Sequence, residues 1–254
     1  MSLGIAGLAY RRHSLSESGF WGAILTGTIT FKAGAAWALI LILFFVSSSA
    51  LSKISSRRKS QAREQFSKGE RRDFWQVMAN GGAAAFFALL YIRSQSPALW
   101  AAYLAAVAVA TADTWATEIG TLSHQNPRLI TTFKPVLPGT SGGVTPAGML
   151  ASPGGAFLIG AVGALMLDAG IAGYALVILI TMAGFSGSLF DSFLGATVQA
   201  VYWCEDHQRL TEKQICSDGN PAVLRRGFAF FNNEMVNFAA TVAGGVIVFF
   251  VVSL

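Results

Sequence analysis

Apolar and polar positions alternate in long blocks that divide the chain into seven apolar segments. Most of these segments have about the 20 residues that a helix needs to cross a bilayer. The pattern therefore predicts an all-α fold, a polytopic transmembrane bundle of about six to seven spans. The segments lie at 17–31, 34–52, 74–94, 97–120, 146–166, 170–198 and 235–254.

Two of these segments depart from the ordinary length. Segment 17–31 is short and contains Gly and Thr, so we expect a tilted or re-entrant element. Segment 170–198 is longer than a bilayer requires, so one end is expected to protrude into water. The apolar run before Arg11 and Arg12 is too short for a signal sequence. Residues 1–254 are expected to form a single integral-membrane domain.

Basic residues fall mainly on one side of the predicted bundle. If the N-terminus is cytoplasmic, all but two of the 18 Lys and Arg residues fall inside, and only Lys32 and Arg93 fall outside. An excess of Lys and Arg marks cytoplasmic loops. The bias predicts a cytoplasmic N-terminus and an external C-terminus in a bacterial inner or thylakoid-type membrane. The long loops near 53–73, 121–145 and 199–234 then share the cytoplasmic face.

Composition supports a membrane protein and excludes an ordinary soluble domain. Charged residues make up 12% of the chain and hydrophobic residues 53%, whereas soluble domains carry about 25% charged residues. The net charge of +5 suits anionic lipid headgroups or nucleotides as partners. No nucleic-acid-binding motif is present, so no nucleic acid partner is expected.

Two carboxylates interrupt the end of the fourth apolar segment. Asp113 lies 16 residues after Pro97, about 24 Å along a helix, and Glu118 follows in the next turn. An ionisable group at membrane depth costs a few kcal/mol and is by default a candidate functional residue. A structural Asp satisfied by Thr or backbone donors is the alternative. We interpret Asp113 and Glu118 as candidate catalytic residues.

A glycine-rich stretch precedes the fifth apolar segment. Glycine allows successive N–H groups to converge on an anion, and a helix N-terminus adds a favourable dipole for phosphate. The Walker A pattern is absent, and a flexible helix connection is the simpler reading. The candidate phosphate-binding residues here are Lys134, Gly139, Thr140, Ser141, Gly142 and Gly143.

Two further polar groups lie at the predicted cytoplasmic boundary. Ser188 and Asp191 share a helical stripe with Gly195 near the end of the sixth segment, where close helix packing explains the small residues but not the acid. Two arginines lie before the last segment, and three asparagines lie just before it and in its first residues. One of these amides is explained as an N-cap. These amides and arginines are Asn232, Asn233, Asn237, Arg225 and Arg226.

These four stretches converge on one side and one depth of the predicted bundle. Carboxylates, an Asn carbonyl and phosphate oxygens together are a typical Mg²⁺ environment. We therefore expect nucleotide phosphoryl transfer, with Asp191 as a third catalytic residue and with Mg²⁺ held by Asp113, Asp191 and Asn233. The Gly-rich stretch, Ser188 and the amides are expected at the nucleotide phosphates. Arg225 or Arg226 is expected to meet the acceptor's phosphate.

The two cysteines lie in a polar loop and give only a weak signal. Cys204 and Cys216 have no paired C-x₂-C spacing, so zinc binding with His207 and Asp206 or Asp218 is the less favoured reading. We expect reduced cysteines with no special role.

The motifs "ADTWATEIG", "PGTSGGVTPAG", "GSLFDSFLGATVQ" and "NNEMVNF" resemble the integral-membrane family of plant and cyanobacterial phytyl-phosphate kinases and their animal relatives of unknown role. The resemblance extends from "SLSESG" at 14–19 through "FFVSSSALSK" to the last span. It implies a kinase of tocopherol biosynthesis that converts an isoprenyl monophosphate to its diphosphate with CTP or ATP and magnesium. Asp113, Glu118, Thr140, Ser141, Asp191 and Asn233 fall in the matching motifs.

Two other functions remain alternatives. Intramembrane acids and glycine-rich helices also fit a lipid-phosphate transporter or flippase, although the polar residues lie at one side and not at the midplane. A cytidylyltransferase that forms a CDP-lipid would use similar chemistry and would release pyrophosphate. The sequence is compatible with a homodimer but does not fix the oligomeric state, the prenyl chain length or the nucleotide.

Overall fold

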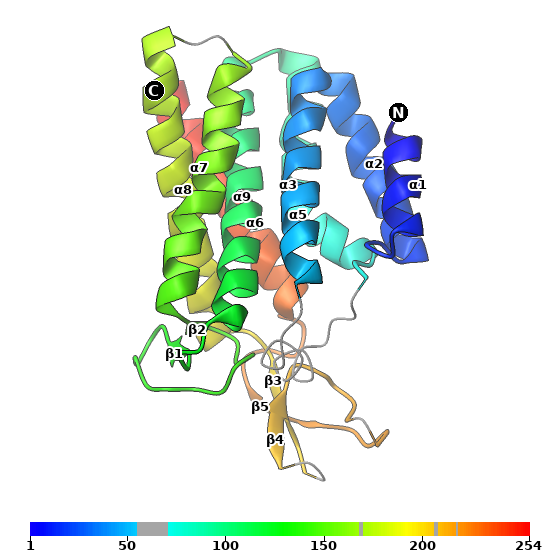
Figure 1. Cartoon of the computed structure of the whole chain (residues 1–254), viewed down its shortest axis with the longest axis vertical. Coiled ribbons are helices and arrows are strands. Elements are labelled where there is room, and N and C mark those ends of the chain that lie inside the picture. The colour runs from blue at the N-terminus through cyan, green and yellow to red at the C-terminus, as the bar shows by residue number, and fades with distance from the viewer. Residues whose placement is uncertain (55–70, 168–169, 206–207, 217) are drawn as a thin grey trace.

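The computed structural model describes residues 1–54, 71–167, 170–205, 208–216 and 218–254. In the described part, eight helices stand side by side, and short strands lie beyond one end of them (Figure 1). The helices are α1 Ser2–Arg11, α2 Glu17–Ala33, α3 Ala35–Lys53, α5 Phe74–Ser94, α6 Pro97–Leu122, α7 Pro146–Leu165, α8 Gly170–Thr197 and α9 Asn233–Ser253.

The predicted helical bundle is confirmed. Six helices, α3 and α5 to α9, are long and apolar enough to cross a membrane. Segment 17–31 corresponds to α2, whose 17 residues extend about 25 Å. Helix α8 has 28 residues, about 42 Å, which exceeds the roughly 30 Å hydrocarbon core. Helix α1 was not predicted, because its ten residues are too few for a membrane-crossing pattern.

Four helices begin at the strand-bearing end of the bundle, and each begins with a side-chain cap. Ser16, Asp73, Thr145 and Asn232 accept hydrogen bonds from the N–H groups of Gly19, Gln76, Gly148 and Met235 at 2.9–3.1 Å. These caps fix where α2, α5, α7 and α9 start. Because a helix N-terminus carries partial positive charge, four such termini make this end of the bundle favourable for anions.

Helix α6 lies at the centre of the bundle. In its most apolar stretch 83% of the residues are buried, and 97–122 includes ten alanines or glycines that allow neighbouring backbones to approach. Helices α7, α8 and α9 pack against it closely enough that an added Cβ on Gly184 would lie 2.5 Å from Ala156 and 3.1 Å from Ala108. The central helix therefore holds Asp113 at a fixed place among three neighbours.

Two small antiparallel sheets lie in the loops at the lower end of Figure 1. The first pairs β1 Arg128–Leu129 with β2 Gly143–Val144, and the second has the order β4-β3-β5. Its strands are β3 Val201–Cys204, β4 Arg209–Thr211 and β5 Val223–Arg226. The prediction had treated both regions as loops, because these strands are only two to four residues long.

The expectation of reduced cysteines is wrong in this structure. Cys204 and Cys216 form a disulfide, because the chain turns back after β3 and brings their Cα atoms within 5.9 Å. The sulfurs are thus not available as zinc thiolates, although Asp218 lies next to them. Asp206 and His207 lie outside the described residues, as does 55–70 within the expected loop 53–73.

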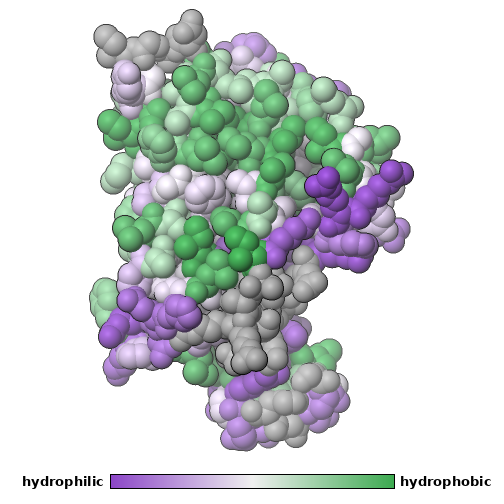
Figure 2. Space-filling model, viewed as in Figure 1, coloured by the Kyte–Doolittle hydropathy of each residue, from purple (hydrophilic) through white to green (hydrophobic). Residues whose placement is uncertain are grey.

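The surface separates into an apolar part and a polar end. Figure 2 shows hydrophobic residues over the upper helices and hydrophilic residues gathered towards the strand-bearing end. Both ends of the chain lie in the upper half of Figure 1. The N-terminus lies there because the short helix α1 runs antiparallel to α2. Arg11 and Arg12 nevertheless lie at the lower end of α1, on the side of the long loops.

Candidate functional site

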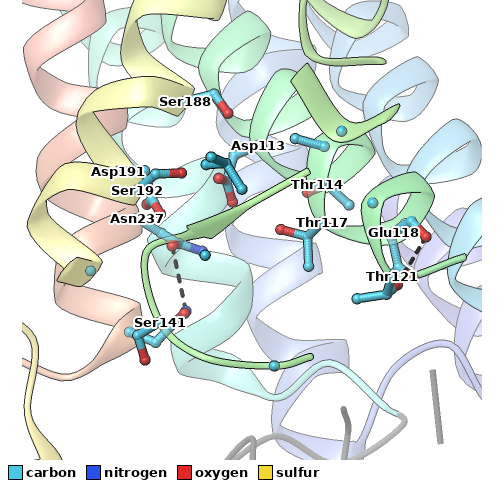
Figure 3. Close-up of a pocket in the computed structure, with 18 of the residues that line it drawn as sticks. Asp113, Thr114, Thr117, Glu118, Thr121, Ser141, Ser188, Asp191, Ser192 and Asn237 are labelled. Atoms are coloured by element: carbon cyan, nitrogen blue, oxygen red, sulfur yellow. Dashed lines mark hydrogen bonds between the residues drawn. The ribbon is translucent and has the colours of Figure 1, made fainter. Parts of the chain in front are cut away.

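A polar cavity of about 520 Å³ opens at the strand-bearing end of the bundle. Its walls come from α3, α5, α6, α7, α8 and α9 together with the loops 123–145 and 199–212. Segments that are more than 100 residues apart in the chain therefore meet around one space. Figure 3 shows the acids and hydroxyl groups of α6, α8 and α9 directed towards this space.

The deepest part of the cavity contains two carboxylates from different helices. Asp113 projects from α6 towards Asp191 and Ser188 on α8 (Figure 3). Asn237 of α9 is buried beside them and, with its amide nitrogen facing the acid, donates to Asp191 Oδ2 at 2.8 Å and to the Asn233 carbonyl at 3.2 Å. Three helices thus contribute oxygen and amide groups to one point.

The glycine-rich loop forms another part of the cavity wall. Gly142 has φ +80°, a conformation that favours glycine, and an added Cβ would lie 2.5 Å from the Cβ of Ala196 on α8. The neighbouring Ser141 hydroxyl donates to Glu212 Oε1 at 2.7 Å, and Gln199 Nε2 donates to the same oxygen at 2.8 Å. The loop is therefore held against α8 by close packing and by a hydrogen-bonded network from the second sheet.

Glu118 lies on the same helix as Asp113 but in another part of the cavity. Its carboxylate accepts a hydrogen bond from the Ser52 hydroxyl of α3 at 2.5 Å. Figure 3 shows Glu118 and Thr121 well apart from the Asp113–Asp191 pair. The two acids of the motif "ADTWATEIG" therefore serve different regions of one cavity.

Basic side chains line the side of the cavity near Glu118. They are Arg12, Lys53 and Arg72, at the ends of α1 and α3 and just before α5. Burial lowers the pKa of Arg72 to about 10, and the Glu118 carboxylate opposes this shift, so the guanidinium stays charged at neutral pH. The cavity thus has an acidic region on α6 and α8 and a basic region on the N-terminal helices.

The structure brings most of the predicted residues to this cavity. It is lined by Asp113, Glu118, Gly139, Thr140, Ser141, Gly142, Gly143, Ser188, Asp191, Asn233 and Asn237. Lys134 is exposed and lies outside the lining, and so does Arg225 on β5. Asn232 caps α9 through Met235 N and also lies outside it.

Arg226 supports the cavity wall without lining the cavity. Its guanidinium donates to the Gly195 carbonyl at 2.8 Å and to the Ser141 carbonyl at 3.5 Å. Burial lowers the pKa of Arg226, and the charge of Glu212 opposes the shift. This arginine joins β5, α8 and the glycine-rich loop. The acceptor-phosphate role expected for Arg225 or Arg226 stays a prediction, and neither side chain lines the cavity.

Sequence reasoning missed several lining residues. Gln76 and Asn80 at the start of α5 face the cavity, as do Gln199 and Glu212 near the second sheet. Gln76 and Asn80 are spaced four residues apart, so they share a helix face, and this spacing was an available signal. Glu212 carried no such signal, because only the fold of 199–212 brings it to Ser141.

The donor set suits a hard divalent cation. Asp113 and Asp191 offer carboxylate oxygens, and Asn233 and Asn237 add amide groups, which are ligands that Mg²⁺ accepts together with phosphate oxygens. The cavity also contains Ser152, whose hydroxyl is buried and lacks a hydrogen-bond partner among the described residues. A buried hydroxyl of this kind is costly to leave unsatisfied, so it favours a polar ligand in the cavity.

Known proteins resemble the chain over nearly its whole length. A family model described as integral membrane protein DUF92 matches residues 1–245. Protein PGR of Arabidopsis thaliana is 32% identical, over 93% of this chain and 88% of the relative. An uncharacterized membrane protein of Methanocaldococcus jannaschii is also 32% identical, over 92% and 84%. Protein VTE6, chloroplastic, of Arabidopsis thaliana is 26% identical, over 88% and 61%. No solved structure matches the chain.

Proposed function

Because the chain belongs to the integral membrane protein family DUF92, we propose that it is a membrane kinase that phosphorylates an isoprenyl monophosphate. The observation that carries this proposal is the meeting of Asp113, Asp191 and Asn237 with the glycine-rich loop in one cavity. The match to VTE6 and the resemblance of the four motifs to phytyl-phosphate kinases support the same class.

In the proposed reaction, an oxygen of the lipid monophosphate attacks the γ-phosphorus of a nucleoside triphosphate. The bond from that phosphorus to the β-bridging oxygen breaks, and the nucleoside diphosphate leaves. The acceptor oxygen is already anionic, so the protein has to align and neutralise charge more than to remove a proton. The product is the isoprenyl diphosphate.

The residues of the cavity fit the separate parts of this reaction. Mg²⁺, held by Asp113, Asp191 and the amides of α9, would supply charge neutralisation at the nucleotide phosphates. The N–H groups of Ser141 and Gly142 and the N-terminal turn of α7 would bind phosphate oxygens, since the N–H groups of Thr140 and Gly143 already donate to carbonyls of their own loop. Asn237 orients Asp191 through its hydrogen bond to Oδ2. Arg72, Lys53 and Arg12 would attract the second phosphate at the other side of the cavity.

The test is turnover by purified full-length protein. Phytyl or geranylgeranyl monophosphate is incubated with Mg²⁺ and with CTP or ATP in turn, and the lipid products are measured by mass spectrometry. Lipid diphosphate together with nucleoside diphosphate supports the kinase. Pyrophosphate with a CDP-lipid would instead identify a cytidylyltransferase, and unchanged lipid with every nucleotide would contradict both enzymes.

We also propose that the cavity faces the cytoplasm or its equivalent, because the basic residues cluster at that end. The Cys204–Cys216 disulfide favours the opposite compartment, since cytosolic thiols are normally kept reduced. The charge bias outweighs the disulfide as an indicator of orientation, because many Lys and Arg residues contribute to it and the disulfide is a single pair. Single cysteines at Ser94 and Gln125, in a background without the two native cysteines, should be labelled from opposite sides. Labelling of the Gln125 site from outside intact cells would overturn this orientation.

A further inference from the structure

A second cavity lies between the N-terminal helices, next to the polar one. It has a volume of about 80 Å³ and is lined by α1, α2, α3 and the first turns of α5. Small or apolar side chains form its wall, including Ala9, Ala23, Leu41, Phe44 and Gly81. The interior of this part of the bundle is thus not completely filled by its own side chains.

The two threonines of α2 in the wall of this cavity already donate to carbonyls of their own helix. The hydroxyl of Thr26 donates to the Gly22 carbonyl at 3.0 Å, and the hydroxyl of Thr30 donates to the Thr26 carbonyl at 3.1 Å. Both threonines therefore present their methyl groups to the space between the helices. The cavity suits a hydrocarbon and offers little to a polar ligand.

The apolar and polar cavities share three lining residues, Arg72, Gln76 and Asn80. The Arg72 guanidinium lies over the rings of Phe44 and Phe45, 5.7 and 5.3 Å from their centroids. Among the described residues it donates one side-chain hydrogen bond, to Ser49 Oγ at 3.4 Å, whereas a guanidinium carries five N–H donors. A positive charge therefore stands where the apolar space meets the polar one.

This arrangement matches an amphiphile with one anionic head and one narrow tail. A phosphate at Arg72 would have its hydrocarbon chain directed between α2, α3 and α5, and its free oxygens directed into the polar cavity. The apolar cavity is small beside the roughly 300–1,000 Å³ of most ligand pockets. It admits part of a single chain and excludes a lipid with two chains side by side.

We propose that this cavity binds the first isoprene units of a single-chain lipid phosphate, with the phosphate held by Arg72 and Asn80. The proposal rests on the proposed function and names the subsite for its acceptor. It also distinguishes the isoprenyl substrate from a diacyl lipid such as phosphatidic acid, which a CDP-lipid-forming enzyme would use.

Gly81 provides the sharpest test, because it lies at the wall with room beside it. An added Cβ would lie 3.8 Å from Leu41 Cδ1 and 3.9 Å from Thr26 Cγ2, so Gly81→Ala fits by ordinary contact and Gly81→Leu fills the cavity. We expect Gly81→Leu to lower kcat/KM for geranylgeranyl phosphate at least tenfold, relative to methyl phosphate, a short substrate that has no isoprene unit to place in the cavity. Gly81→Ala should show the same change in smaller degree, and the KM for nucleotide should stay within about twofold.

The matched control is Gly154→Leu on α7, where an added Cβ meets nothing within 4 Å. It should leave the ratio of kcat/KM for the long and short substrates unchanged. An unchanged ratio in both Gly81→Leu and a well-folded Gly81→Ala would overturn the tail subsite. An equal fall of this ratio in Gly154→Leu would also overturn the tail subsite, because the effect of the added side chain would then not be local to the cavity.

A labelling experiment separates failure of the subsite from failure of the kinase. Geranylgeranyl phosphate with a diazirine near its head is photolysed with the full-length protein, and the attachment site is mapped by mass spectrometry. Labelling of α2, α3 or α5 at the cavity, lost in Gly81→Leu, supports the subsite even if no turnover is found. Labelling only on lipid-facing surfaces, or competition by phosphatidic acid, would contradict it.

Discussion

Helices α6 to α9 pack closely against one another at their shared contacts, whereas the short helix α1 leaves open space beside it. An added Cβ on Gly163, Gly184 or Gly244 would lie 2.5–2.6 Å from a side chain of the neighbouring helix. On α1, by contrast, an added Cβ on Gly4 or Gly7 would meet nothing within 4 Å. The close-packed helices hold the acids, and the loosely packed helices surround the apolar cavity.

This difference matches the two kinds of ligand chemistry that the proposed function requires. Groups that hold a metal and a triphosphate have to stay within fractions of an ångström of a fixed arrangement, and rigid packing provides this. A hydrocarbon tail makes non-directional contacts, so a loosely packed region accommodates it well. The comparison predicts that substitutions in the close-packed helices impair chemistry or folding, whereas substitutions in the loose region change substrate preference.

The largest effect is expected from removing an acid in the close-packed region. Asp191→Asn keeps the size of the side chain and an acceptor for Asn237 but removes the negative charge. We expect turnover to fall at least 100-fold, which corresponds to about 2.7 kcal/mol of transition-state stabilisation. Stabilisation of the protein by Mg²⁺ with nucleotide should also decrease, as measured by thermal unfolding.

The control for this prediction is Asp218→Asn, an equivalent change at an exposed acid on the strand region. Its turnover should stay close to that of the wild type. Near-normal turnover of Asp191→Asn, with lower stability in the absence of ligands, would assign a purely structural role to Asp191.

A smaller effect, on stability, is expected from filling the contact between the close-packed helices. Gly184→Val would place its side chain against Ala156 and Ala108, where no space is available. Overpacking of this kind costs about 1–3 kcal/mol, so the unfolding temperature should drop and less monodisperse protein should be recovered. Gly4→Val in α1 should unfold at the wild-type temperature, and an equal loss in both variants would show that the packing difference has no energetic consequence.

The smallest effect is expected at the glycine-rich loop. Gly142→Ala would strain a backbone at φ +80° and push its Cβ against Ala196, so the loop should shift away from α8. We expect the KM for nucleotide to rise about tenfold, equivalent to about 1.4 kcal/mol. Gly219→Ala is a matched control, because Gly219 has φ +90° with nothing within 4 Å. If both variants keep the wild-type KM, this loop does not bind the nucleotide.

Much of the bundle was predictable because hydrophobic length is a direct physical requirement of a membrane. The start of α5 at Phe74 and of α7 at Pro146 agreed with the apolar segments, since capping residues and proline mark helix starts. The short strands and the Cys204–Cys216 disulfide were not predictable, because they depend on how a polar loop folds back.

The candidate site was predictable in part for a similar reason. Asp113 and Asp191 stand out because an acid in an apolar segment is costly and needs an explanation. The stretch 69–73 is expected from the sequence to help line a site, but Arg72 has no specific role in that prediction, since it follows a run of other charged residues. Only the packing of 14–16 against Arg72, through hydrogen bonds at 3.0 and 3.2 Å, shows that this arginine is held at the cavity.

The helices that line the polar cavity are far apart in the sequence, and this separation affects how the chain inserts into the membrane. Helix α6 carries Asp113 into the bilayer, but α9, which supplies Asn237, begins about 110 residues later. At roughly 5–20 residues per second of synthesis, that interval lasts between about 5 and 20 seconds. During this time the acid has to be shielded by the translocation machinery or by the helices already made. Biogenesis therefore favours an early antiparallel pair of α5 and α6, joined by a turn of two residues, as the scaffold on which the later helices assemble.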